Sequence, residues 1–566
     1  MRPLISEELK ERHARPSRAV ALAGAALAAV SPFLSWAYTA GALDGVSLYG
    51  NPSPLQWVFF VMALLLVLLM APLPGRLKGI RRLVDRPAGA RALATGLLVT
   101  AIVMVAAIAI ELGGLVTLEP GAWVAFAGAL LAFLGTRFHQ PRGSTSLVTR
   151  RTPSWVQVLA IVVVMAGGLF LAAYALGIDD GGSFVMIVVA AGALALAAGR
   201  LGVGAWLARA GRENRTVLLL AIFVTAFLFP FTQNGTEANM SIATQALVFA
   251  VTALGLNIVV GLAGLLDLGY IAFLGAGAFT AAVLSESAFS TISWHPPFIV
   301  TVLISGLVAS CFGLLIGSPT LRVSGDYLAI VTLAFGEIFR ITMNNLDGTD
   351  GPMITRGANG ISAIPDLNLL GFDFGKPHQL FGITFGRFSS YYFLLLILLA
   401  VVMVVFANLN NSRIGRGWIA IREDEKAAEA MGVNVFGLKL FAFAGGAFLA
   451  GVAGAVKAHQ DVSIVPDQFV FLESAFLLAA VVLGGMGTIG GVILGAVLLK
   501  LMPEKLRFIN EYRLLIFGVL LVLMMRFRPE GLIPAKRRQL EFHEDDEELA
   551  DDIDEFLMRR STEEGR

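Results

Sequence analysis

The chain has 566 residues, of which 57% are hydrophobic and only 15% are charged, and its formal net charge is +1. A soluble domain carries about 25% charged residues, so this composition indicates a protein that lies in a lipid bilayer. The near-zero net charge excludes a nucleic-acid partner held by bulk charge. The single cysteine, Cys311, excludes an internal disulfide and argues against a metal cluster.

Six apolar runs in the first part of the chain are long enough to cross a bilayer as helices. We expect these spans at residues 19–39, 55–72, 92–111, 121–135, 155–176 and 184–207. Arginine-rich loops alternate with loops that contain neither lysine nor arginine, so the positive-inside rule places the basic loops and the N-terminus in the cytoplasm. Residues 1–212 are therefore predicted to form a six-helix membrane module. It has no chemical motif, and we interpret it as a packing or regulatory appendage.

A second group of apolar runs begins at Thr216 and contains more glycine and more breaks. The expected spans are 216–231, 241–261, 265–285, 297–319, 327–345, 389–408, 436–456, a broken element at 474–501, and 511–527. Counting crossings places the polar loop 346–388 outside and the basic loop 409–435 inside. The predicted fold is an all-α, polytopic membrane bundle of about 14–15 segments with glycine-broken helices in its core. Residues 531–566 are predicted to be an acidic, disordered cytoplasmic tail.

Glycines crowd the middle of the broken element at 474–501. Each half has about 12 residues and reaches about 18 Å as a helix, which is short of the roughly 30 Å hydrocarbon core. A re-entrant hairpin beside protein or a water-filled path solves this difficulty, although it places Lys500, Lys505 and Arg507 outside, against the positive-inside trend. Tight packing alone is the other interpretation. The glycines concerned are Gly484, Gly485, Gly487, Gly490 and Gly491.

A second glycine-broken segment, 261–279, contains Asp267 and Gly269. Two such segments, one in each half of the region, suggest an internal repeat around a translocation path. Asp267 is either a functional intramembrane acid or the cap of the helix that begins just after it, and we favour the cap. Glu337 and Arg340 share one helix face. They form either a polar spot on a path for a zwitterion or a structural ion pair, and we favour the ion pair.

The basic loop 409–435 contains a charged, alanine-rich segment that we predict to be about one short helix. It lies between apolar runs, so it is suited to contact another protein at the cytoplasmic face. The residues expected to make that contact are Arg422, Glu423, Asp424, Glu425, Lys426, Ala428, Glu429 and Gly432. The sequence has no Gly-x-x-x-x-Gly-Lys-Ser/Thr loop, no histidines at metal-ligand spacing and no recognisable nucleophile–base pair. We therefore predict no enzyme activity, no metal and no cofactor.

Four segments, taken in order, resemble the permeases of branched-chain amino acid ABC importers, the LivM type. They are residues 264–279, 321–345, the charged segment just described and 482–496, within a region of about 216–530. The resemblance implies an importer permease domain at 213–530, in the plasma (inner) membrane with both termini cytoplasmic. It implies import of leucine, isoleucine or valine with a homologous permease, two ATP-binding cassette subunits and an extracytoplasmic binding protein. By resemblance, Glu423 to Gly432 form the segment that couples the permease to the ATPase.

Two features depart from the family pattern. The outer loop has Thr355-Arg-Gly-Ala-Asn-Gly-Ile361 where the family often has Thr-Gly-Gly-Pro-Asn-Gly-Ile, and residues 1–212 exceed the usual permease. An importer of urea or short-chain amides is the alternative within the same class. An ion-coupled secondary transporter would need clustered intramembrane acids, and we find only Asp267 and Glu337. A structural or regulatory membrane protein is a third class, against which the coupling segment argues.

Overall fold

The computed structural model describes most of the chain between residues 7 and 505. The described ranges are 7–37, 54–71, 86–137, 152–177, 181–233, 236–320, 326–349, 351–369, 371–380, 382–505 and 531–533, with single positions between 515 and 526. The predicted span at 511–527 and the acidic tail at 531–566 lie almost wholly outside the described residues. Two compact units result: Met1–Asn234 with Lys505–Phe508, and Gly235–Glu504 with Ile509–Arg566.

The first unit is all helical in the part that the structure describes, and its apolar runs form the expected helices. The elements are α1 (Glu7–Val30), η1 (Ser31–Phe33), α2 (Pro54–Met70), α4 (Arg86–Glu111), η3 (Leu115–Thr117), α5 (Pro120–Arg137), α6 (Ser154–Gly177), α7 (Gly181–Arg200), α8 (Val203–Glu213) and α9 (Arg215–Thr232). Helix α9 packs on α6 and so belongs to this unit, although the sequence suggested a module that ends at residue 212.

Small residues allow α1 and α5 to approach closely. A Cβ atom at Gly128 would lie only 2.6 Å from the backbone nitrogen of Ala28. Ala21, Ala25 and Ala132, on the same faces, have no exposed surface. Membrane helices associate through such small-residue faces because lipid provides no hydrophobic drive between them.

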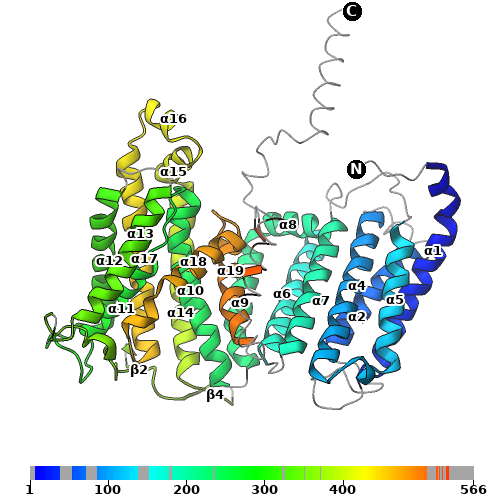
Figure 1. Ribbon diagram of the computed structural model, residues 1–566, viewed down its shortest axis with the longest axis horizontal. Helices are drawn as coiled ribbons and strands as arrows, with labels where there is room; N and C mark the ends of the chain where they lie inside the picture. The colour runs from blue at the N-terminus through cyan, green and yellow to red at the C-terminus, as the bar shows by residue number, and fades with distance from the viewer. Residues whose placement is uncertain are drawn as a thin grey trace, which may run out of the picture. The chain divides into compact units, whose positions relative to one another are not determined.

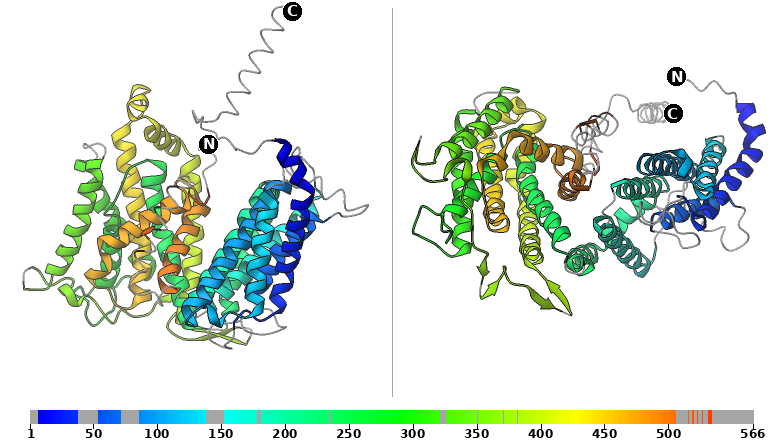
Figure 2. Two further views of the ribbon diagram at one scale, coloured as in Figure 1. Left: turned by 45° about the vertical axis from the view of Figure 1, so that its right-hand side comes forward. Right: turned by 60° about the horizontal axis from the view of Figure 1, so that its bottom comes forward.

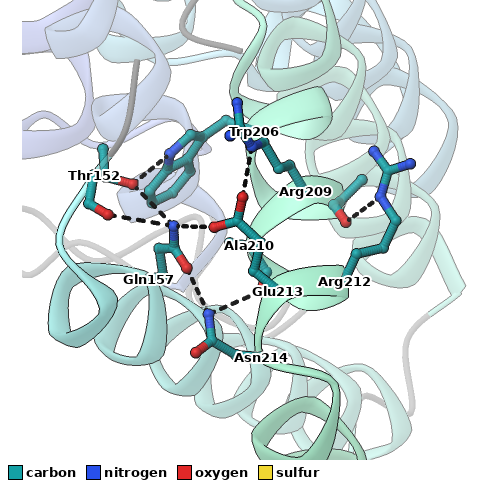
Figure 3. Close-up of polar contacts among 9 residues, drawn as sticks. Thr152, Gln157, Trp206, Arg209, Ala210, Arg212, Glu213 and Asn214 are labelled. Atoms are coloured by element: carbon teal, nitrogen blue, oxygen red, sulfur yellow. Dashed lines mark hydrogen bonds and ion pairs between the residues drawn. The ribbon is translucent and has the colours of Figure 1, made fainter. Parts of the chain in front are cut away.

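The expected span at 184–207 is two helices, since α7 and α8 meet at an angle of 80°. Gly202 between them has φ +81°, a left-handed conformation that glycine adopts without strain. A polar network then holds the amphipathic helix α8 against the start of α6 (Figure 3). Gln157 donates to Glu213 at 2.7 Å, and Trp206 donates to Thr152 Oγ1 at 3.2 Å. These bonds satisfy the polar groups of the cluster and give it a structural role.

The second unit contains the broken segments and the charged loop. Its helical elements are α10 (Glu237–Asn257), the π-helical turn η5 (Ile258–Leu262), α11 (Ile271–Val283), α12 (Phe298–Thr320), α13 (Asp326–Asn345), η6 (Gly357–Asn359), α14 (Arg387–Asn411), α15 (Arg413–Glu423), α16 (Glu425–Ala430), α17 (Val435–Asp461), η7 (Pro466–Phe469), α18 (Phe471–Gly484) and α19 (Ile489–Lys505). Two short antiparallel hairpins lie in the loop 346–388 (Figure 2), namely β1 (Asn368–Leu369) with β2 (Phe372–Asp373) and β3 (His378–Leu380) with β4 (Ile383–Phe385).

Helix α17 packs against α10, α11 and α12, and small residues make this possible. A Cβ at Gly451 would lie 2.6 Å from the carbonyl oxygen of Ser305 in α12. On the α11 side, Tyr270 donates its hydroxyl hydrogen to the carbonyl of Gly446 at 2.5 Å. Helix α10 packs against α14, α17 and α18, and 94% of its apolar stretch is buried.

The helices fit a polytopic membrane protein. Among the described residues, nine helices are long and apolar enough to cross a membrane by length and composition, or ten if α7 and α8 form one span. Three further apolar helices are shorter. The total of about 14–15 membrane segments stays a prediction.

Candidate translocation and coupling site

The charged loop forms two helices, which corrects the expectation of about one. Asp424 lies in extended backbone between α15 and α16, and its Oδ1 accepts a hydrogen bond from Ala427 N at 3.0 Å. An aspartate in this position caps the next helix and so starts α16 as a separate element. Beyond α16, Gly432 has φ +83° and donates its N–H to the carbonyl of Glu429 at 2.9 Å, which ends the segment. We call α15, α16 and Gly432 the docking segment.

Most of the predicted contact residues in the docking segment are exposed. Glu423, Asp424, Glu425, Lys426 and Glu429 face solvent, while Ala428 is buried. The apolar Met431 at the tip is 84% exposed. One side of α16 is anchored, because Glu425 pairs at 2.6 Å with Lys439 of α17, whose side chain is only 8% exposed.

Arg422 points toward the membrane helices instead of outward. Its Nη1 donates to the carbonyl oxygen of Gly261 in η5 at 2.8 Å. Gly264, just beyond η5, has φ +72°, and a Cβ there would collide with the Arg422 side chain. Arg422 therefore links the docking segment to the glycine-broken segment at 261–279.

The two glycine-broken segments contact each other through Asn257, which the sequence analysis did not identify. This side chain has no exposed surface. Its Oδ1 accepts from Gly487 N at 2.8 Å, and its Nδ2 donates to the carbonyl of Thr488 at 3.3 Å. A Cβ at Gly261 would lie 2.6 Å from Gly487 N, so the backbones themselves are close.

Helices α18 and α19 form a tight antiparallel hairpin (Figure 1). A Cβ at Gly484 would collide with the backbone of Gly491, and the turn between them uses positive φ angles at Gly485 and Gly487. Gly490 differs from the others, because a Cβ there would meet only Ile533, at 3.9 Å. With 14 and 17 residues, the helices reach about 21 and 26 Å, less than the roughly 30 Å core.

The charged ends of this hairpin are paired. Lys500 of α19 lies 2.9 Å from Glu473 of α18 and 4.8 Å from the ring centroid of Phe249. Of the three basic residues that stand against the positive-inside trend, Lys500 is thus paired with a carboxylate. Both open ends of the hairpin lie together, which is the geometry that a re-entrant segment requires.

The capping role expected for Asp267 is wrong. Helix α11 begins at Ile271, and its N-cap residue is Tyr270, without a side-chain cap. Asp267 is 1% exposed, and its Oδ1 instead accepts from Gly269 N at 2.9 Å inside the break. Gly269 allows α13 to pack closely against this segment, because a Cβ at residue 269 would collide with the carbonyl of Thr332 in α13.

Glu337 and Arg340 of α13 form an ion pair, with Arg340 Nε 3.0 Å from Glu337 Oε1. Arg340 Nη1 also lies 3.0 Å from Asp467 in η7. The side chains of Arg340 and Glu337 are 24% and 41% exposed. The pair therefore joins α13 to η7 at the end of the unit.

A cavity of about 460 Å³ lies among α10, α11, α14, α17, η7, α18 and α19. It is at the end of the unit opposite the docking segment, since it lies at the start of α14 and the end of α17, whereas the docking segment lies between the end of α14 and the start of α17. None of the predicted path residues lines it. Its charged residues are Arg387, Lys457, Asp461, Glu473 and Lys500, and its amides are Gln245, Gln460 and Gln468.

Comparison with known proteins decides the family. Residues 238–525, just over half of the chain, match the family described as branched-chain amino acid transport system / permease component. The chain belongs to this permease family. The match begins three residues beyond the start of the second unit at Gly235, so the permease region and the second unit nearly coincide at this end.

The relatives of this permease are transport permeases, and it is not an enzyme. The high-affinity branched-chain amino acid transport system permease protein LivM of Salmonella typhimurium is 42% identical over 340 residues, which are 58% of this chain and 77% of that protein. LivM of Escherichia coli has the same identity and coverage. The probable LivM of Methanocaldococcus jannaschii is 28% identical over 308 residues, 50% of this chain and 84% of that protein. No solved structure matches the chain.

Proposed function

We propose that this permease is a membrane-spanning subunit of an ATP-driven importer for leucine, isoleucine and valine. The family and the LivM relatives support the substrate class. The importer would contain a homologous permease, two ATP-binding cassette subunits and an extracytoplasmic binding protein, in the inner membrane. Both termini of this chain would lie in the cytoplasm, on the same side as the docking segment.

The observation that carries the proposal is a continuous set of contacts from the docking segment to the hairpin. Arg422 binds the carbonyl of Gly261 in η5, and Asn257, the residue just before η5, accepts a hydrogen bond from Gly487 at the hairpin tip. The open end of the same hairpin carries Glu473 and lines the cavity. A rigid hairpin contacted at both ends can convert movement of the docking segment into a change in cavity shape.

Within the docking segment, α16 is the element that would enter a cleft of the ATPase. Its exposed charges and the exposed Met431 offer a polar surface with one apolar anchor, the usual composition of a protein interface. The ion pair between Glu425 and the buried Lys439 fixes α16 to α17, so a force on α16 also reaches the long helix. ATP binding and hydrolysis in the partner would thus switch the path between outward and inward access.

The test is Arg422→Met in the complete importer, reconstituted into proteoliposomes with its partner subunits. The variant keeps an unbranched, flexible side chain but loses the guanidinium group and its hydrogen bond to the Gly261 carbonyl. We expect normal assembly with strongly reduced leucine uptake per ATP hydrolysed. Arg416→Met on the same helix is the matched control, because Arg416 is exposed and its side chain donates to the nearby carbonyl of Asn411. Coupled uptake by Arg422→Met at the level of Arg416→Met would contradict the proposal.

The same proteoliposomes separate the alternatives. A urea or short-amide importer would take up labelled urea or acetamide in preference to leucine. An ion-coupled transporter would accumulate substrate without the ATPase subunits when an ion gradient is imposed. Uptake of leucine that requires both ATP and the ATPase subunits excludes both alternatives.

A further inference from the structure

The cavity joins charged and apolar surfaces in a volume suited to a small ligand. At about 460 Å³ it falls in the range of small-molecule sites. Helices α10 and α11 contribute most of its apolar side chains, which are Val248, Phe249, Ile271 and Leu274, and α14 adds Phe388. The charged side chains come from α14, α17, α18 and α19. A ligand with one charged end and one apolar end would match this division.

Two ion pairs present both signs of charge to the cavity. Lys457 and Asp461 pair one turn apart on α17, and their side chains are each 20% exposed. Lys500 and Glu473 pair across the hairpin and are 27% and 30% exposed. Partly exposed ion pairs contribute little net stability, so each member can exchange its partner for a ligand charge at small cost.

Two glutamine oxygens in the cavity wall lack a donor among the described residues. Gln460 is 1% exposed and donates through Nε2 to Thr244 Oγ1 at 3.1 Å, while its Oε1 is buried without a partner. Gln468 donates to the carbonyl of Ser463 at 3.3 Å, and its Oε1 is likewise unpaired. Buried acceptors of this kind are unfavourable. A ligand with several N–H donors would relieve that cost when the wall closes around it.

We propose that this cavity binds a zwitterionic α-amino acid on its way into the permease. The α-carboxylate would contact Lys457 and Lys500, and the α-ammonium would contact Asp461 and Glu473. The branched side chain would lie on the apolar residues of α10 and α11. The inference rests on the proposed function and deepens it, because it names the groups that recognise the substrate. Urea and short amides have no carboxylate for the two lysines.

The experiment uses the complete importer with binding protein in excess and labelled leucine as the probe. Lys500→Met and Lys457→Met are each expected to lower leucine uptake per assembled complex at least about 10-fold, as befits loss of a charge-assisted contact. ATP hydrolysis stimulated by the binding protein should be retained, because the docking segment is untouched. Lys376→Met is the matched control, since Lys376 is 76% exposed and pairs with Asp373 in the outer loop.

A swapped pair, Lys500→Glu with Glu473→Lys, separates recognition from fold stability. The swap keeps an ion pair but moves the positive charge to the other helix, so uptake should stay low. Wild-type uptake by both lysine variants would overturn the proposal, and so would full restoration by the swapped pair. If the unaltered importer takes up no leucine, the proposed function itself fails, which is a different result from normal leucine uptake by the variants.

Discussion

The contact between the two glycine-broken segments can be tested at a single residue, Asn257. This buried side chain bonds both sides of the hairpin tip, accepting from Gly487 N at 2.8 Å and donating to Thr488 O at 3.3 Å. The substitution Asn257→Leu keeps the number and branching of the side-chain heavy atoms but can make neither bond. It therefore leaves a backbone donor and a backbone acceptor at the tip without their partner.

The expected size of the effect follows from these two groups. A buried polar group that loses its partner costs about 1–3 kcal/mol. The bond to Gly487 is short and the bond to Thr488 is long, so we expect the free energy of unfolding to fall by about 2–4 kcal/mol in total. Coupling should suffer more than assembly, because the altered contact lies between η5 and the hairpin.

The assay is titration of the purified importer in mixed micelles with a denaturing detergent, followed by leucine uptake in proteoliposomes. Asn411→Leu is the control, since Asn411 is exposed at the end of α14 and its Nδ2 donates to the carbonyl of Ala407 one turn earlier. We expect this control to change stability by less than about 0.5 kcal/mol. An Asn257→Leu protein as stable as the control, with normal uptake, would refute the role given to this side chain.

Three further predictions concern the coupling region and the first unit. Gly264 has φ +72°, and in Gly264→Ala the new Cβ would collide with the Arg422 side chain, so this variant should reduce coupled uptake. Gly445→Ala in α17 is the control, because a Cβ there meets nothing within 4 Å, and equal uptake by the two variants would exclude the steric argument. In Gly432→Pro, the proline cannot adopt φ +83° and has no N–H to donate to Glu429. This variant should insert into the membrane but lose uptake and stimulated ATP hydrolysis, and wild-type transport would contradict the prediction. A chain that begins at Gly235 should retain some leucine uptake per assembled complex, because the docking segment, the hairpin and the cavity all lie in the second unit; zero uptake from assembled complexes would place the first unit in the transport path.

The membrane helices could be predicted from the sequence because their determinants are local. A bilayer requires about 20 apolar residues whose backbone bonds are satisfied within the segment, and each such run in the described residues is a helix. The glycine-rich break at 484–491 was also visible, since glycine permits the positive φ angles of the hairpin turn. The docking segment could be located from its charged residues. Its division into two helices depends on the capping hydrogen bond of Asp424, which the composition of the segment does not reveal.

The cavity and its link to the docking segment were decided by tertiary structure alone. Gly487 lies 230 residues from Asn257, and Arg422 lies 161 residues from Gly261, so no local pattern connects them. Lys457 and Lys500 resemble ordinary charges at the ends of apolar spans until the packing of α17 and the hairpin brings them to one cavity. Hydropathy and glycine content act over a few residues and therefore determine helices and breaks. A site assembled from six helices and a 3-10 turn depends on how those helices pack, which is a property of the whole unit.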